Sequence, residues 1–228
     1  MRTLSNSIFG PDDVKNALVS LRSCGYFKLP LNIVEADCQA FMEYIDSALP
    51  GSESHYGDTE SRIWDAEKKE KSIFNLQKQL DSCLSAIFGH APECNTTLGI
   101  RNLALQDRNF DIGRWHVDSV RSQYKFFCFL TTVHSDNGPL MVVRGTASKW
   151  FKIKQILKGI YFSLLDFKNG TRKYTQIDDA YINKLLDNGY SSQELICSAG
   201  DIFLVNTSML HRAKPIKRGE RYALVSYY

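Results

Sequence analysis

The sequence lacks any apolar run near the roughly 18–20 residues that a membrane-spanning helix requires. Its first residues, MRTLSNSIFGPDD, also lack the apolar stretch of a secretory signal peptide. Cysteine pairs of the CxxC type are absent, and the six cysteines lie far apart in the chain. We therefore expect a cytoplasmic protein without a membrane span, in which the thiols stay reduced and mostly buried.

The chain also has little net charge, because 28 Lys and Arg residues stand against 25 Asp and Glu residues and give a formal charge of +3. It has no dense Lys/Arg row interleaved with aromatic side chains, so nucleic acid is not an expected partner. A chain of 228 residues can bury one good core. We expect residues 1–228 to form a single domain.

Hydrophobic periodicity predicts helices in the N-terminal part of the chain, about residues 1–95. Apolar residues recur at helical spacing over three segments, at 11–24, 34–49 and 73–87. A short strand is predicted at 26–29, between the first two helices. The polar, glycine-containing segment 50–62 predicts a loop.

From about residue 96 the pattern changes to β-branched and aromatic runs, which are typical of strands. These runs lie at 97–105, 124–133, 140–143, 194–197, 202–206 and 222–228. The segment 147–193 interrupts them with mixed helix and loop, and it carries the main basic stretch, from Lys149 to Lys173. The order predicts an α+β protein with a mainly β core: a sandwich or barrel, backed by N-terminal helices and carrying a helical insertion. The mouth of such a barrel commonly encloses a ligand.

The motif WHVDS places His116 and Asp118 two positions apart. On a strand, residues i and i+2 point to the same face, so both side chains can reach one ion. A second histidine, His211, follows a later strand. Two neutral imidazoles and one carboxylate form a facial triad, which leaves open positions on iron(II). The alternative is a structural pair of His116 and Asp118, with His211 partly buried elsewhere.

Arg221 follows His211 by ten residues and lies in the last predicted strand. Strand alternation and a short turn can bring its guanidinium back beside the triad, where its fixed fork of donors would hold a carboxylate. The alternative is an arginine in a salt bridge at the rim of the barrel.

These residues and their neighbours resemble the phytanoyl-CoA dioxygenase family of Fe(II)/2-oxoglutarate-dependent oxygenases. The resemblance covers most of the chain from residue 25 onward, in order and in approximate spacing. The matching pieces are GYFKLP, WHVD at 115–118, NGPLMVVRGTAS at 137–148, GDIFLVN at 200–206, His211 and Arg221.

The resemblance implies a double-stranded β-helix, or jelly roll, and an iron(II) site formed by His116, Asp118 and His211. It implies that Arg221 anchors the far carboxylate of 2-oxoglutarate. Asn102 and Lys125 stand where the family often places further cosubstrate contacts, although plain solvent exposure is an equal alternative for Lys125. The implied reaction uses O2 to hydroxylate an unactivated C–H bond of a small molecule, with release of succinate and CO2.

The chain departs from the family at residues 144–148, where it reads Arg-Gly-Thr-Ala-Ser instead of Pro-Gly-Ser/Thr-His. Related halogenating enzymes lack the carboxylate of Asp118, so its presence favours hydroxylation, desaturation or ring closure. The basic stretch from Lys149 to Lys173 is either a solvated face or an attraction for an anionic substrate. The alternatives in function are a non-catalytic jelly roll that binds a metal or a small ligand, and a cupin-type metal hydrolase or isomerase.

Overall fold

The computed structural model describes residues 4, 9–51, 55–56, 60–90, 93–104, 113–158, 160 and 175–228. The helices are α1 (Pro11–Ser23), α2 (Glu35–Ala48), α3 (Ala66–Lys69), α4 (Lys71–Phe88), α5 (Lys149–Leu157) and α7 (Asp179–Asp187), with a 3-10 turn η1 (Leu49–Gly51). The strands are β1 (Tyr26–Asn32), β2 (His55–Tyr56), β3 (Glu60–Ile63), β4 (Thr96–Leu103), β5 (Trp115–Val117), β6 (Tyr124–Phe129), β7 (Leu140–Val143), β8 (Thr175–Ile177), β9 (Ser192–Leu195), β10 (Asp201–Asn206), β11 (His211–Ala213) and β12 (Glu220–Tyr227).

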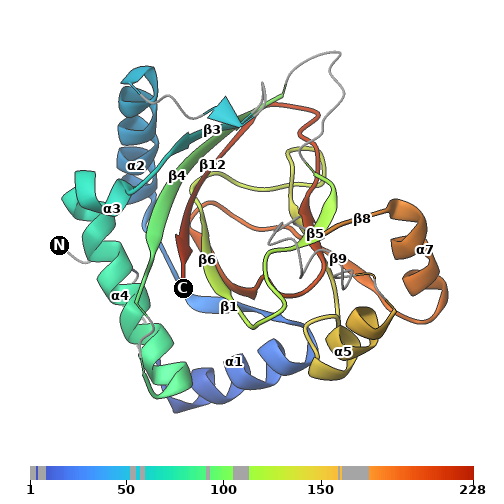
Figure 1. The fold of residues 1–228 in the computed structure, drawn as a ribbon. Coiled ribbons are helices and arrows are strands. Elements are labelled where there is room, and N and C mark those ends of the chain that lie inside the picture. The colour runs from blue at the N-terminus through green and yellow to red at the C-terminus, as the bar shows by residue number, and fades with distance from the viewer. Residues whose placement is uncertain are drawn as a thin grey trace, which may run out of the picture.

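The strands form two antiparallel sheets that face each other (Figure 1). The large sheet has seven strands in the order β1-β10-β6-β12-β4-β3-β2, and the small sheet has five in the order β8-β5-β11-β7-β9. From β4 onward, strands β4, β6, β10 and β12 enter the large sheet, and β5, β7, β9 and β11 enter the small one, which β8 extends at one edge. This interleaving is the double-stranded β-helix that the family resemblance implies, and its first strand begins at Thr96, close to the expected boundary.

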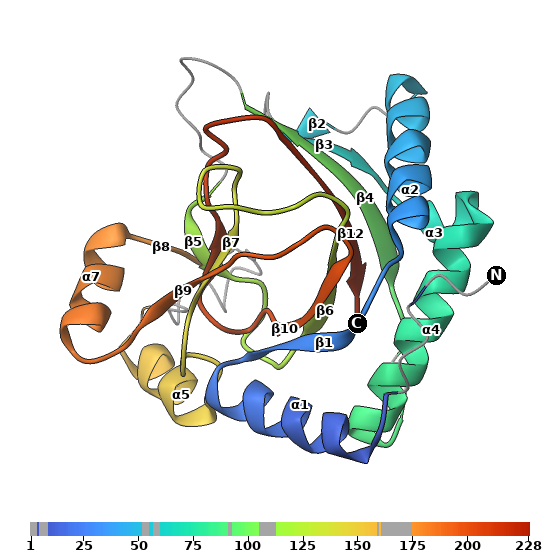
Figure 2. The same cartoon turned by 180° about the vertical axis from the view of Figure 1, so that it is seen from behind.

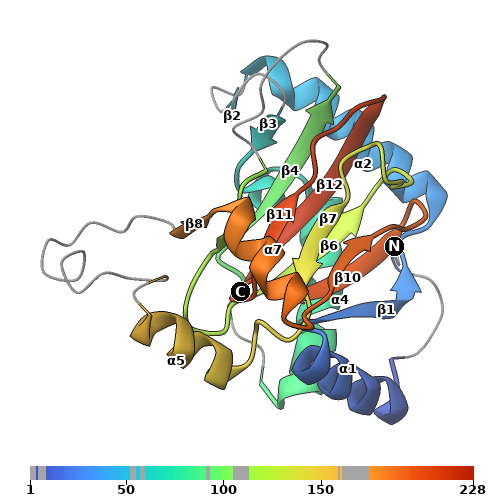
Figure 3. The ribbon, with the colours of Figure 1, turned by 90° about the vertical axis from the view of Figure 1, so that its right-hand side faces the viewer.

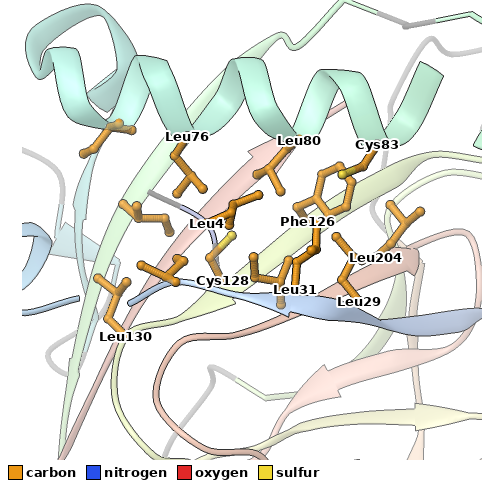
Figure 4. Packing of buried hydrophobic residues seen from close by; sticks show 14 of the residues in the cluster. Leu4, Leu29, Leu31, Leu76, Leu80, Cys83, Phe126, Cys128, Leu130 and Leu204 are labelled. Carbon is orange, nitrogen blue, oxygen red and sulfur yellow. The ribbon is translucent and has the colours of Figure 1, made fainter. Parts of the chain in front are cut away.

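Strand alternation divides the large sheet into a face toward the helices and a face toward the small sheet. Along β12, Tyr222 and Leu224 join the cluster against the helices, whereas Ala223 and Val225 join the cluster between the sheets. Figure 4 shows α4 resting Leu76, Leu80 and Cys83 on Phe126, Cys128 and Leu204 of the sheet. Their spacing of three or four residues places these α4 side chains on one helix face. Each buried leucine contributes about 1.5–3 kcal/mol.

The helices lie on opposite sides of the two sheets. Helices α2, α3 and α4 lie along the outer face of the large sheet, and α1 lies near its β1 edge (Figure 2). The insertion lies on the other side (Figure 3), where α5 and α7 bury Phe151 and Ile182 against Trp115 and Val143 of the small sheet. Because the helices cover the outer sides of the two sheets, the inner face of the large sheet faces only the small sheet.

Two sequence expectations differ from the structure. The segment 50–62 was predicted to be a loop, but it contains β2 and β3, which extend the large sheet beyond β4. The reason is that β3 carries charged residues on its inner face, so it shows no apolar alternation. The insertion 147–193 contains strand β8 and the start of β9 besides its helices. Its residues 159 and 161–174 lie outside the described residues.

The structure also bears on the expectations for cysteines and membrane spans. None of the helices in the described ranges combines the length and the apolar character needed to cross a bilayer. All six cysteines are free, and burial raises the pKa of four of the thiols well above neutral, so that they stay protonated. These four are Cys38, Cys83, Cys128 and Cys197.

Gly200, at the turn into β10, supplies a test of the fold. It adopts a φ of +88°, its N–H donates to the carbonyl of Phe129 over 2.7 Å, and a Cβ there would meet the carbonyl oxygen of Ile33 at 2.3 Å. Gly200→Ala combines left-handed strain with a backbone clash, so we expect the free energy of unfolding to fall by about 3 kcal/mol in urea denaturation.

Gly189 is the matched control, because it has the same φ of +88° but nothing within 4 Å of an added Cβ. Gly189→Ala should lower the free energy of unfolding by only about 1 kcal/mol. Equal losses in the two variants would contradict the contact between Gly200 and Ile33.

Candidate metal centre

The two candidate histidines are neighbours across the small sheet. Strands β5 and β11 are paired so that His116 stands directly opposite His211, with ring centroids 4.3 Å apart. Asp118 follows immediately after β5, where its N–H donates to the carbonyl of Thr207 over 3.0 Å. The structure therefore brings together the three residues of the predicted triad.

The three side chains point at one another. Nε2 of His116 lies 3.5 Å from Oδ1 of Asp118, and Nε2 of His211 lies 3.6 Å from Oδ2. One candidate ligand atom from each of the three residues can be chosen so that all lie within 4.8 Å of one another. Two ligands at adjacent positions on a metal with bonds of about 2.1 Å are about 3.0 Å apart. The two His–Asp separations are close to this spacing.

Hydrogen bonds fix the tautomer of both imidazoles. Nδ1 of His116 lies 2.9 Å from the carbonyl oxygen of Arg114, and Nδ1 of His211 lies 2.9 Å from that of Met209. A carbonyl oxygen only accepts, so each Nδ1 carries the hydrogen and each Nε2 presents a lone pair to Asp118. Oδ1 of Asp118 faces Nε2 of His116, and Oδ2 faces Nε2 of His211 and the ammonium of Lys125. Lone pairs that face each other in this way are suited to a cation.

The electrostatics favour the protonation states that metal ligands need. Burial and the neighbouring His116 lower the pKa of His211 to about 4, against an opposite effect of Asp118. Burial would raise the pKa of Asp118, but His116, His211 and Lys125 together hold it below its ordinary value. At neutral pH His211 is therefore uncharged and Asp118 is ionised, as binding of a divalent metal requires.

Lys125 lies beside the triad and not in solvent. It is buried on the inner face of β6, between β10 and β12. Its Nζ lies 2.7 Å from Oδ2 of Asp118 and 3.8 Å from the ring centroid of Tyr227. The alternative of plain solvent exposure is wrong, because the residues that share its face of β6 point toward the small sheet.

Arg221 and Asn102 are buried opposite each other on β12 and β4. Nη2 of Arg221 donates to Oδ1 of Asn102 over 2.8 Å. Nε of Arg221 is buried without a hydrogen-bond partner among the described residues. Burial lowers the pKa of Arg221, but a guanidinium stays charged at neutral pH. A buried cation with an unused donor is suited to an anionic ligand.

The surroundings of Gly138 relate the position of Arg221 to that of the triad. A Cβ on Gly138 would lie 3.3 Å from Nη1 of Arg221 and 2.9 Å from the carbonyl oxygen of Lys214. Lys214 comes three residues after His211, which at about 3.3 Å per residue is about 10 Å. Lys125 pairs with Tyr227, six residues further along β12 than Arg221 and roughly 20 Å away along the backbone. The backbones of the two cationic residues therefore lie toward opposite ends of β12.

Sequence analysis missed Glu60, which the structure adds to this region. It lies on β3, opposite Asn102, and its Oε2 accepts a hydrogen bond of 2.8 Å from Nδ2 of Asn102. Glu60 is buried, although its segment was predicted to be a loop. The only signal in the sequence is the pair of charges at Glu60 and Arg62, which alternate as they would on one face of a strand.

Residues 144–148, which depart from the family motif, have a structural role. The hydroxyl of Thr146 accepts from the N–H of Leu210 over 3.0 Å and donates to the carbonyl of Val143 over 2.6 Å. This loop therefore holds the residue before His211.

The lysines of the basic stretch differ in exposure. Lys149, Lys154 and Lys158 are exposed, as a solvated face would be. Lys152 is buried and donates to Ser208 over 2.7 Å.

The depressed pKa of His211 makes stability depend on pH. In the unfolded chain its pKa is about 6.5, so between pH 6.5 and 4 the unfolded state binds more protons than the folded state. The free energy of unfolding should therefore fall as the pH drops through this window, by up to roughly 3 kcal/mol. Urea denaturation with a chelator present measures it. His211→Gln should flatten the slope, and an equal slope in both proteins would contradict a buried neutral His211.

No family model and no curated protein matches the chain. Among solved structures, the epimerase SnoN in complex with Fe3+, alpha ketoglutarate and nogalamycin RO has a TM-score of 0.71 at 12% identity, over 96% of this chain and 84% of its own. The alpha-ketoglutarate-dependent carbocyclase SnoK from nogalamycin biosynthesis has 0.67 at 14%, over 94% and 83%. EctD from S. alaskensis with bound Fe has 0.67 at 16%, over 100% and 81%. At these identities the likeness establishes the fold that the chain shares with them.

Proposed function

We propose that the chain is an Fe(II)- and 2-oxoglutarate-dependent dioxygenase of the phytanoyl-CoA dioxygenase type, with residues 1–228 as one oxygenase domain. One arrangement carries the proposal: the chain has a His-Asp-His cluster with fixed tautomers and a buried guanidinium with an unused donor. The guanidinium lies near the backbone of Lys214, which is three residues, or about 10 Å of chain, after His211. A keto acid that chelates a metal and carries a second carboxylate would join two such features. Fe3+ and alpha ketoglutarate bound together in SnoN support the choice of cofactors.

In this proposal His116, Asp118 and His211 hold the iron on one side and leave its other positions open. When bound, the iron would supply dioxygen activation coupled to decarboxylation of 2-oxoglutarate to succinate and CO2. Arg221 holds the far carboxylate of the cosubstrate with charge-assisted hydrogen bonds. The Nδ1–H groups of both histidines keep their hydrogen bonds to the backbone, so Nε2 stays aimed at the metal.

In this proposal neither Lys125 nor Asn102 binds the cosubstrate carboxylate directly. Lys125 stabilises the ionised form of Asp118 and holds its carboxylate in place over a distance of 2.7 Å. Asn102 contributes to the cosubstrate site through Arg221, because its amide oxygen already accepts from that guanidinium. Both residues therefore support the groups that bind ligand.

We propose a small-molecule substrate with an anionic group, which the exposed lysines of α5 would attract. Hydroxylation of a C–H bond is the proposed outcome. The structural neighbours SnoK and SnoN are described as a carbocyclase and an epimerase, so this fold also hosts reactions other than hydroxylation. The carboxylate of Asp118 next to both histidines favours all of these over halogenation.

The proposal is tested by binding and turnover. Iron(II)-loaded protein should bind 2-oxoglutarate without oxygen, and should release succinate when oxygen is admitted. Arg221→Ala should raise the Kd for 2-oxoglutarate roughly a hundredfold, because a buried charge pair is lost. Asp118→Ala should abolish metal binding. Calorimetry without oxygen measures both affinities, and succinate assays measure turnover.

Arg212→Ala is the matched control, because Arg212 is next to His211 but its guanidinium lies over the ring of Trp115 and contacts Asp179. This variant should keep the wild-type affinity for 2-oxoglutarate. A wild-type, iron-loaded protein without affinity for 2-oxoglutarate would refute the oxygenase proposal and favour the non-catalytic binding protein.

A further inference from the structure

A carboxylate, an amide and a guanidinium form a row across three strands of the large sheet. Glu60 on β3 stands opposite Asn102 on β4, and Asn102 stands opposite Arg221 on β12. Directly opposed residues share a face, so all three point toward the small sheet. The two hydrogen bonds that join them are each 2.8 Å long.

The hydrogen bonds of the row can run in only one direction, from Arg221 through Asn102 to Glu60. A guanidinium can only donate and an ionised carboxylate can only accept. Asn102 must therefore turn its oxygen to Arg221 and its NH2 group to Glu60. If Glu60 did not accept, nothing in this row would prevent the amide from flipping, and Asn102 would then present donors to the donors of Arg221.

We propose that Glu60 is a positioning residue of the carboxylate site: it fixes the amide of Asn102, and through it the guanidinium of Arg221. This inference rests on the proposed function. With Nη2 held by Asn102, Nε of Arg221 stays available for the far carboxylate of 2-oxoglutarate. The hairpin β2–β3, which lies outside the eight strands of the β-helix (Figure 1), thus contributes to the site.

Glu60 also affects the charge near Arg221. Its Oε1 contacts Nε of Arg62. Removal of the charge of Glu60 would by itself attract an anion more strongly. Loss of its hydrogen bond to Asn102 would weaken binding. The two effects have opposite signs, so they can be separated.

Two conservative variants separate them. Glu60→Asp keeps the charge but shortens the side chain by one methylene, so its carboxylate no longer reaches Asn102. We expect the Kd for 2-oxoglutarate to rise about tenfold, as for loss of a hydrogen bond that orients a charged group. Glu60→Gln keeps an acceptor oxygen for Asn102, while Arg62 is partly exposed and can be solvated. Its Kd should stay within about twofold of wild type or become lower.

The measurements are calorimetric titrations of iron(II)-loaded protein with 2-oxoglutarate, and of the metal-free protein with iron(II), both without oxygen. The affinity for iron(II) should be unchanged in both variants, because the row lies away from the triad; a general structural defect would lower it. In an Asn102→Ala background, Glu60→Asp should have no further effect, since Glu60 acts through Asn102.

Glu220→Gln is the matched control. Glu220 precedes Arg221 in β12 but points to the opposite face, where it contacts Arg101. Its affinity for 2-oxoglutarate should be that of wild type. Wild-type affinity in Glu60→Asp, or equal weakening in the Asn102→Ala background, overturns the role of Glu60 while the proposed function stands. A wild-type protein that does not bind 2-oxoglutarate overturns both.

Discussion

The candidate site depends on the register with which β11 pairs in the small sheet. His211 stands opposite His116 of β5 on one side and Val142 of β7 on the other. A shift by one residue would turn His211 to the other face of the sheet, because side chains alternate along a strand. The hydrogen bond from Leu210 to the hydroxyl of Thr146 opposes such a shift directly before the histidine. The candidate metal centre is therefore a consequence of strand pairing more than of any loop.

The inner face of the large sheet carries three buried polar groups around the candidate site. Lys125, Asn102 and Arg221 are all buried there, and burial of such groups is unfavourable unless they are paired. Arg221 is paired incompletely, because its Nε lacks a hydrogen-bond partner among the described residues. A core selected for stability alone would place apolar residues at these positions. Their presence on one face argues that this face binds a ligand.

The closeness of His116 and Asp118 could be predicted from the sequence, because the two residues stand two positions apart. His211 lies far along the chain, and the order of motifs shared with the family indicated it and Arg221. The burial of Lys125 could not be predicted, because it depends on which face of β6 meets the small sheet. Glu60 was missed for a similar reason: β3 shows no apolar alternation, and only its pairing with β4 reveals a strand. Sequence patterns thus identified the core strands, whereas the polar strand β3 is revealed only by its pairing with its neighbours.

The two buried cations divide the inner face between them. Arg221 pairs with Asn102 at one end of β12, and Lys125 lies near Tyr227 at the other end, with the triad at the Lys125 end through Asp118. A ligand that extends from the triad toward Arg221 therefore leads away from Lys125. Lys125 already faces the carboxylate of Asp118, whereas Arg221 faces only an amide and, beyond it, Glu60. Of the two cations, Arg221 is the one whose charge is left for a ligand to neutralise, and the row that holds it begins outside the β-helix.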